Sequence, residues 1–162
     1  MSDDSHEIDI TPEVIETYCK SHTTPPSPVL SGLITATREE SAQWGMQVGH
    51  LEGRFLSLIT SLIGAKTVLE FGTFTGYSAL SFAEALPENG KVTTLDRDPT
   101  ATNIAKKHWE KSTHGKKIEL LLDDAKLTVA KLEEEIKTGK RPLFDLAFID
   151  ADKARSEEHT SE

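Results

Sequence analysis

The later part of the chain alternates short apolar runs with amphipathic segments, and this alternation constrains the fold more than any other feature. The apolar runs read as strands, at 67–71, 91–95, 117–122 and 143–149. Helical periodicity marks the segments between them, at 76–85, 99–112 and 125–137. Strands that alternate with helices form parallel sheets, because the crossover helices pack on the faces of the sheet. The sequence therefore predicts an α/β fold with a mostly parallel sheet.

The earlier part of the chain is predicted to be helical, with residues 1–45 forming a cap. Thr11, Pro12 and Glu13 supply an N-cap, a proline at the first helical position and an acid in the first turn, which predicts a helix over 12–20. A second helix is expected over 29–37, after a proline-rich break. A third helix, ending at Gly64, is expected to bury one apolar stripe in the core: Leu51, Phe55, Leu58, Ile59, Leu62 and Ile63.

Composition and charge exclude several classes of partner. The chain of 162 residues has 18 Lys and Arg against 27 Asp and Glu, a net charge of −9, and no basic tract that could neutralise nucleic-acid phosphates. The longest apolar segment, 56–65, is far shorter than the roughly 18 to 20 residues of a membrane span. Cys19 is the only cysteine, so an internal disulfide and a thiolate zinc site are excluded. The acidic N-terminus lacks the pattern of a secretory signal, which favours the cytoplasm.

Candidate binding residues follow the strands, because ligands of open parallel sheets bind beyond the carboxyl ends of the strands. After the first strand, Gly72 and Gly76 let the backbone approach a ligand, and the next helix offers N–H groups to a carboxylate or phosphate. Asp96 ends the second strand, where it can accept hydrogen bonds from a ribose diol. This arrangement favours an adenosine-bearing cofactor. The alternative is that Gly72 only turns the chain and Asp96 only ends a strand.

The glycine spacing distinguishes between nucleotide-binding motifs. The segment 72–76 reads GTFTG, which is not the G-x-G-x-x-G that lets a backbone approach the pyrophosphate of NAD. A P-loop is also absent, since no Gly-Lys-Ser/Thr follows. An NAD-dependent reductase of the same fold class is therefore disfavoured.

The fourth strand runs into Asp150, Asp152 and Lys153, which places two carboxylates and an ammonium at the ligand edge. Hard oxygen ligands of this kind suit magnesium or calcium. A lysine close to a divalent cation can have its pKa lowered toward the range of a general base. An ordinary ion pair between Lys153 and one of the aspartates is the alternative interpretation.

From Met46 to Lys153 the chain resembles the class I S-adenosylmethionine-dependent O-methyltransferases of the caffeoyl-CoA and catechol O-methyltransferase family. The resemblance is carried by MQVGHLEGRFL, VLEFGTFTGYSAL, TLDRDP, DDA and FDLAFIDADK, in family order. LEFGTFTGYS and FIDADK together are specific. The resemblance implies a Rossmann-like three-layer sandwich whose S-adenosylmethionine-binding core covers 46–153.

The resemblance further implies nine cofactor-binding positions. They are Met46 and Val48 beside the cofactor, Glu70, Gly72 and Thr73 in its binding loop, Ser78 at the methionine carboxylate, Asp96 at the ribose hydroxyls, and Asp124 and Ala125 at the adenine.

The resemblance also implies the reaction. Asp150 would ligate a divalent cation, usually magnesium, that binds both oxygens of a vicinal diol, with Asp152 close behind it. Lys153 would be the general base that deprotonates the reacting hydroxyl, whose oxygen then attacks the sulfonium methyl in line. The acceptor is expected to be a small catechol-like or hydroxycinnamoyl compound, and the enzyme a homodimer.

The sequence departs from the family after Lys153. The family continues with a helix, a strand whose Asp-Asn pair completes the metal site and a final hairpin, and none of these follows here. The segment 155–162, RSEEHTSE, resembles the translation of a sequencing-library adapter, so 154–162 is expected to be a non-native tail of a truncated reading frame. Truncation predicts missing last strands, a bare apolar strand edge and marginal stability. It also leaves open an alternative function, a non-catalytic cofactor-binding module or pseudoenzyme.

Overall fold

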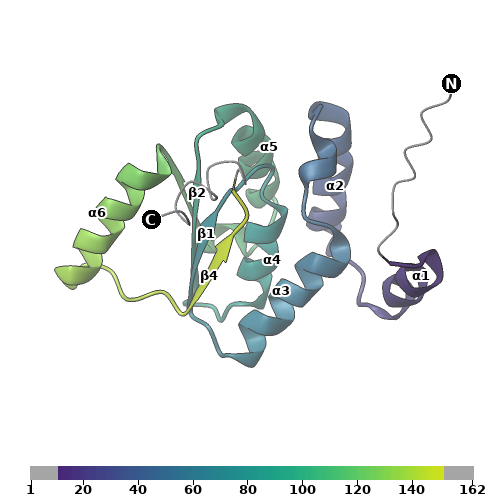
Figure 1. Cartoon of the computed structure of the whole chain (residues 1–162), viewed down its shortest axis with the longest axis horizontal. Coiled ribbons are helices and arrows are strands. Elements are labelled where there is room, and N and C mark those ends of the chain that lie inside the picture. The colour runs from purple at the N-terminus through teal and green to yellow at the C-terminus, as the bar shows by residue number, and fades with distance from the viewer. Residues whose placement is uncertain (1–10, 152–162) are drawn as a thin grey trace, which may run out of the picture.

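A computed structural model describes residues 11–151, which contain one four-stranded sheet (Figure 1). The strands are β1 (Thr67–Phe71), β2 (Lys91–Asp96), β3 (Ile118–Leu122) and β4 (Leu146–Ile149). Their order is β3-β2-β1-β4, and each neighbouring pair is parallel. Helices lie on both faces, so the predicted α/β, Rossmann-like fold with three layers is confirmed.

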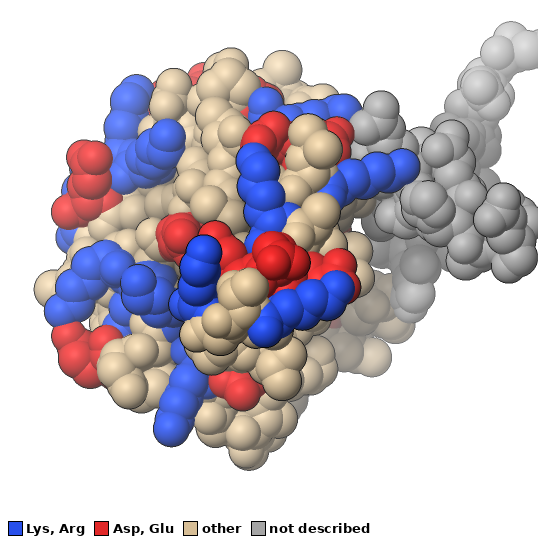
Figure 2. All heavy atoms as spheres, turned by 90° about the vertical axis from the view of Figure 1, so that its left-hand side faces the viewer, with Lys and Arg blue, Asp and Glu red and all other residues tan. Residues whose placement is uncertain are grey.

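The two faces of the sheet are covered unequally. One face carries α6, and the other carries α4 and α5, with α2 and α3 packed outside them and α1 at the outer end (Figure 1). The helices are α1 (Glu13–His22), α2 (Pro28–Glu40), α3 (His50–Leu62), α4 (Tyr77–Ala85), α5 (Pro99–Trp109) and α6 (Ala125–Lys137). Acidic and basic side chains are mixed on the side that α6 covers (Figure 2). None of the helices within 11–151 is long and apolar enough to cross a membrane.

The predicted elements occur within about three residues of their predicted bounds, and the start of β4 is among the bounds that shift most. This strand begins at Leu146, three residues later than predicted, because Asp145 anchors a turn before it. The Asp145 carboxylate accepts hydrogen bonds from the backbone N–H groups of Lys66 (2.8 Å) and Thr67 (2.9 Å). The backbone N–H of Asp145 also donates to Thr67 O (2.9 Å), so this bend attaches the chain to β1 just before β4 begins.

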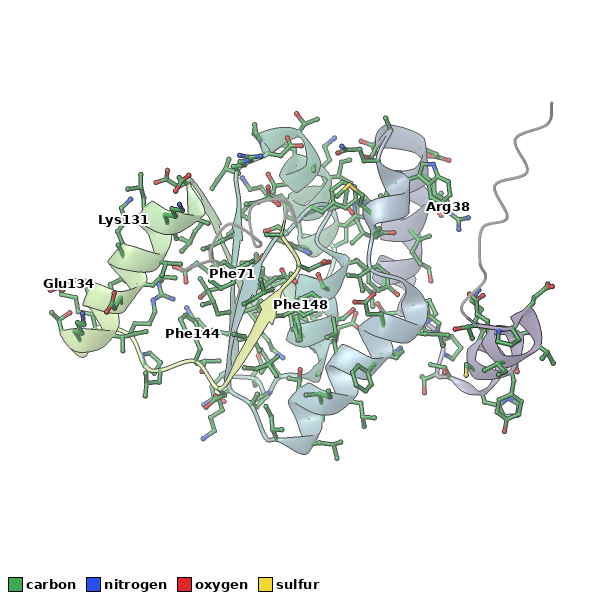
Figure 3. All side chains as sticks on the ribbon, viewed as in Figure 1. Arg38, Phe71, Lys131, Glu134, Phe144 and Phe148 are labelled. Atoms are coloured by element: carbon green, nitrogen blue, oxygen red, sulfur yellow. The ribbon has the colours of Figure 1, made fainter. Side chains whose placement is uncertain are left out.

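Helix α4 forms the centre of the core. Its residues from Tyr77 to Ala83 are all buried, because the sheet lies on one side of the helix and α2 and α3 lie on the other. Phe82 meets Phe148 of β4 edge to face, with ring centroids 5.8 Å apart, whereas Phe71 and Phe144 lie on the side of α6 (Figure 3). A helix that is apolar on all sides is stable only when it is enclosed in this way.

The predicted orientation of α3 is wrong. Phe55, Leu58, Leu62 and Ile63, all predicted to be in the core, are between 53% and 73% exposed. The buried residues of α3 are instead Gly53, Leu56 and Thr60. A side chain at Gly53 would come within 2.6 Å of the Tyr77 ring, so the small residues are what lets α3 approach α4 closely. Close approach of small residues outweighs the apolar stripe here.

Candidate functional site

The four strand ends meet at one edge of the sheet. Backbone hydrogen bonds join them: Gly72 N to Leu95 O (2.9 Å), Asp123 N to Asp96 O (3.0 Å) and Asp150 N to Phe71 O (2.9 Å). The sheet order places the four predicted site segments, at 124, 96, 70–73 and 150, side by side along this edge.

The loop after β1 has an unusual backbone. Gly72, Phe74 and Gly76 have φ angles of 95°, 48° and 81°, and Phe74 is the one non-glycine residue with a positive φ in the described part of the chain. A side chain at Gly72 would overlap the Asp150 carbonyl group, so glycine is required there. A non-glycine residue in this region typically costs about 1–3 kcal/mol and needs support from its surroundings.

Asp96 provides that support. Its Oδ2 accepts hydrogen bonds from Thr73 N (2.9 Å) and Phe74 N (2.7 Å). Its Oδ1 accepts from Arg97 N (2.7 Å) and Asp98 N (2.9 Å). A carboxylate has about four acceptor positions, and all are in use. Asp96 therefore anchors the loop to the end of β2. Neither prediction from the sequence, that it binds a ribose or that it only ends a strand, included this role.

Glu70 is fully buried under the start of α4. Its Oε2 accepts a 2.5 Å hydrogen bond from the Thr94 hydroxyl, and Oε1 has no hydrogen-bond partner among the described residues. Burial raises the pKa of Glu70 to about 7, against the hydroxyls of Ser78 and Thr94, which favour its charged form. The nearby carboxylates of Asp150 and Asp96 raise this pKa further. A buried acceptor without a partner suits a cationic donor from a ligand.

The start of α4 lies next to this carboxylate. The helix has Gly76 as its N-cap, with no side-chain cap, and Ser78 in its first turn is buried. Uncapped N–H groups at a helix N-terminus favour an anion. A lone carboxylate oxygen and a helix N-terminus at one place can together hold both ends of a zwitterion.

Two more of the predicted cofactor-binding residues lie on the segment before α3. Val48 is buried and Met46 is 65% exposed. Between them, Gln47 donates hydrogen bonds from Nε2 to the hydroxyls of Thr37 (2.7 Å) and Thr75 (3.0 Å), which ties this segment to the loop after β1. Sequence reasoning missed Gln47, Thr75 and Thr94. The only signal of these residues in the sequence is that they are polar where the apolar pattern of the elements predicts apolar side chains.

At the end of β3, Asp124 is the N-cap of α6, and Ala125 is the first residue of that helix. The Asp124 carboxylate accepts hydrogen bonds from Lys126 N (2.9 Å) and Leu127 N (3.4 Å). Both predicted positions are exposed at the ligand edge of the sheet.

The described residues do not form a metal site. Within 11–151, no group of three His, Cys, Asp or Glu side chains is placed to hold an ion. Asp150 is exposed at the end of β4, where it offers a single carboxylate, whereas Mg²⁺ demands near-octahedral coordination. Asp152 and Lys153 lie outside the described residues.

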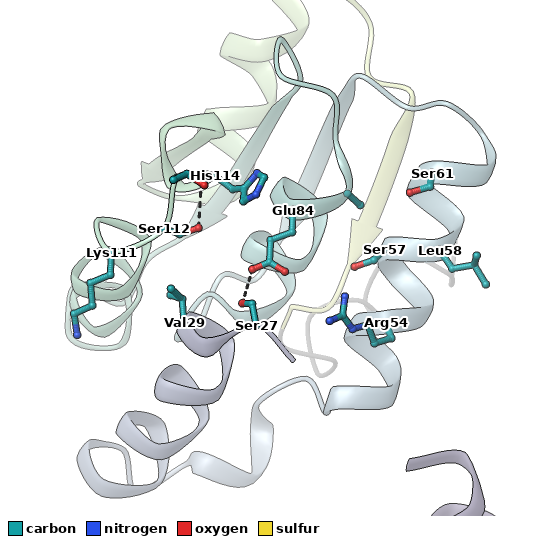
Figure 4. Close-up of a pocket in the computed structure, with 12 residues that line it drawn as sticks. Ser27, Val29, Arg54, Ser57, Leu58, Ser61, Glu84, Lys111, Ser112 and His114 are labelled. Atoms are coloured by element: carbon teal, nitrogen blue, oxygen red, sulfur yellow. Dashed lines mark hydrogen bonds between the residues drawn. The ribbon is translucent and has the colours of Figure 1, made fainter. Parts of the chain in front are cut away.

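A cleft of about 650 Å³ lies elsewhere (Figure 4). It is lined by Ser27 at the start of α2, Arg54 and Leu58 of α3, Glu84 near the end of α4, and the segment after α5. Because α4 starts at the carboxyl edge of the sheet and its end lines this cleft, the cleft lies toward the opposite edge. It is not part of the candidate site.

Residues 20–160 match the model of a protein family described as O-methyltransferase. The chain belongs to the O-methyltransferase family. A caffeoyl-CoA O-methyltransferase of Populus kitakamiensis is 43% identical over 118 residues, which are 73% of this chain and 49% of that protein. A catechol O-methyltransferase of Niastella koreensis is 37% identical over 75% of this chain and 54% of its own length. The chain spans about half the length of these curated relatives.

Solved structures of O-methyltransferases share the fold. The enzyme of Bacillus cereus in complex with SAH superposes with a TM-score of 0.74 at 27% identity, covering 91% of this chain and 64% of that one. TomG of Streptomyces achromogenes, an O-methyltransferase involved in tomaymycin synthesis and solved in complex with SAM, superposes with a TM-score of 0.73 at 26% identity over the same shares.

Proposed function

We propose that the protein transfers a methyl group from S-adenosylmethionine to a hydroxyl of a small catechol-like or hydroxycinnamoyl acceptor. The observation that carries the proposal is the buried Glu70 carboxylate, whose Oε1 has no partner in the described part of the chain, beside the start of α4. The named activities of the curated relatives support the acceptor class.

The residues at the edge of the sheet fit the cofactor. When bound, S-adenosylmethionine supplies an electrophilic methyl group on a sulfonium. Glu70 would accept hydrogen bonds from its ammonium, while Ser78 and the first N–H groups of α4 would hold its carboxylate. Gly72 and Thr73 would line the loop around the bound cofactor, and Met46 and Val48 would flank the cofactor. Its ribose hydroxyls would share the Asp96 oxygens with the backbone, and its adenine would lie against Asp124 and Ala125.

The acceptor chemistry rests on residues after β4. We propose that Lys153 takes the proton of the acceptor hydroxyl, so that the oxygen bonds to the methyl carbon while the carbon–sulfur bond breaks. A requirement for a divalent cation, with Asp150 as one oxygen ligand, stays a prediction from the family resemblance. Because the described residues do not complete such a site, no step is assigned to the ion. A cytoplasmic location also stays a prediction.

The test combines binding with turnover. Calorimetry should show that the chain binds S-adenosylmethionine and S-adenosylhomocysteine, with NAD as the control that does not bind. Methyl-labelled cofactor should then transfer its label to catechol or caffeoyl-CoA in the presence of magnesium, and a chelator should abolish the transfer. Lys153→Ala should abolish transfer and leave cofactor affinity unchanged.

Each other outcome has a definite meaning. Binding without transfer in the parent chain would favour the alternative, a non-catalytic cofactor-binding module. If the parent chain binds neither S-adenosylmethionine nor S-adenosylhomocysteine, the proposal is overturned. Transfer that survives in Lys153→Ala removes the general-base role of that lysine.

A further inference from the structure

Three polar side chains from distant parts of the chain meet in a closed triangle. Gln47 Nε2 donates hydrogen bonds to the hydroxyls of Thr37 (2.7 Å) and Thr75 (3.0 Å), and these two hydroxyls lie 2.9 Å from each other. Thr37 belongs to α2, Gln47 to the segment before α3, and Thr75 to the loop after β1. The triangle therefore joins the N-terminal helices to the edge of the sheet where the proposed cofactor residues lie.

The polar groups of this triangle are matched to one another. Thr37 and Thr75 are fully buried, so their hydroxyls need partners within the protein. The Thr37 hydroxyl also lies 2.8 Å from Leu33 O, one turn earlier in α2. One hydrogen on each hydroxyl and two on the Gln47 amide are enough for all of these contacts. An apolar side chain in place of Thr37 or Gln47 would break the triangle and leave a buried hydroxyl with fewer partners.

The segment that contains Gln47 has few other attachments. Residues 42–46 are exposed, and the backbone hydrogen bonds of this stretch are local. Arg38 of α2 lies over the exposed ring of Trp44, 5.7 Å from its centroid, where water weakens the contact. Val48 is buried, but an apolar contact has no preferred direction. Gln47 is therefore the residue that orients this segment by directed bonds.

We propose that Gln47 is a positioning residue for S-adenosylmethionine. The inference rests on the proposed function, in which Met46 and Val48 flank the cofactor. While Gln47 is bound to Thr37 and Thr75, its two neighbours are held beside the loop after β1 before the cofactor arrives, so less ordering is needed on binding. Cofactor affinity then depends on Thr37, although α2 contains none of the proposed cofactor-binding residues.

Calorimetric titration of the full chain with S-adenosylhomocysteine tests the proposal. Thr37→Val and Gln47→Met remove the hydrogen bonds and keep most of the side-chain volume. Each should raise the dissociation constant about five- to tenfold. Thr37→Ser keeps the hydroxyl, so it should bind about as tightly as the parent. Because Gln47 is only half-buried, Gln47→Met decides the outcome if Thr37→Val does not fold.

Thr60→Val is the matched control. Like Thr37, Thr60 is fully buried within a helix, and its hydroxyl donates to a carbonyl one turn earlier, Leu56 O (2.7 Å). In the described part of the chain, that hydroxyl bonds to no other element. Both valine variants should lower the melting temperature, whereas only Thr37→Val should weaken binding. Equal loss of affinity in the two variants would assign the effect to general destabilisation and overturn the proposal.

A double-mutant cycle tests whether the residues act through one network. Gln47→Met should weaken binding in the parent and have little further effect in Thr37→Val, because the triangle is already broken there. Fold-changes that simply multiply would overturn the proposal. A parent chain that does not bind S-adenosylhomocysteine would overturn the proposed function and this inference with it. A parent that binds, with an affinity that Gln47→Met leaves unchanged, would overturn this inference alone.

Discussion

The buried carboxylate of Glu70 lowers the stability of the folded chain as the pH rises. Its carboxylate is fully buried, and burial raises its pKa to about 7. Because the pKa in the folded chain lies above that of an exposed glutamate, the favourable neutral form is present at low pH. This contribution to stability is lost as the pH rises from about 4.5 through about 7. Above neutral pH the ligand-free chain therefore carries a buried charge that hydroxyl groups only partly compensate.

Replacing Glu70 with glutamine should have opposite effects on stability and binding. Glu70→Gln keeps the shape and removes the charge, so it should stabilise the ligand-free chain, by about 2 kcal/mol more at pH 8 than at pH 5. It should also weaken binding of S-adenosylmethionine, because the ammonium loses its anionic partner. Urea unfolding at the two pH values and calorimetry would measure both. Glu134→Gln, the same substitution at an exposed position of α6, is the matched control. Equal stabilisation at both pH values would contradict the claim that Glu70 carries a buried charge at pH 8.

At the scale of elements, the segment between α6 and β4 is held by Arg141. Its guanidinium pairs with Glu119 of β3 (Nη1 to Oε2, 2.8 Å) and with Glu135 of α6 (Nε to Oε2, 2.8 Å), and also donates to the Thr93 hydroxyl (3.0 Å). The Arg141 side chain is 19% exposed, so these bonds are less screened than those of a surface pair. One side chain thus connects two strands and the helix on that face.

Arg141→Ala should therefore destabilise the chain by about 1–2 kcal/mol near neutral pH, a value reduced for the partial exposure of both glutamates. The Arg141 guanidinium lowers the pKa of Glu119. The contribution is present above the pKa of an unfolded glutamate and is lost as the pH falls through the lower folded value. Urea unfolding should show the difference between variant and parent shrinking below about pH 4. Lys131→Ala, which removes an exposed pair with Asp123, should change stability little.

Alternating apolar runs were enough to predict the elements of the sheet, because each run must be buried between crossover helices. The end of each strand then pointed to Gly72, Asp96 and Asp150, whereas Glu70 was predicted only from the family resemblance. The same reasoning failed for α3, because periodicity identifies an apolar face and not the neighbour that covers it. Thr94 and Gln47 were also missed, since their roles arise only when distant segments meet.

At the scale of the whole molecule, the two edges of the sheet differ in charge. Within 11–151, β3 and β4 each have a neighbouring strand on one side only. The β3 edge contains Glu119, paired with Arg141, whereas β4 reads LAFI without a charge. Beside β4, an apolar groove of about 320 Å³ separates α6 from the sheet, lined in part by Leu69, Leu143 and Phe144. An uncharged edge strand next to apolar surface is a template for pairing with other chains.

This difference predicts which edge drives aggregation. Ile149 is 70% exposed at the end of β4, so Ile149→Lys should slow heat-induced aggregation several-fold and change the free energy of unfolding by no more than about 0.5 kcal/mol. Leu122→Lys, at the end of β3, is the matched control and should slow aggregation little, because charge already protects that edge. Light scattering during heating and urea unfolding would measure the two quantities. Equal protection by both substitutions would show that added positive charge, rather than the β4 edge, governs aggregation.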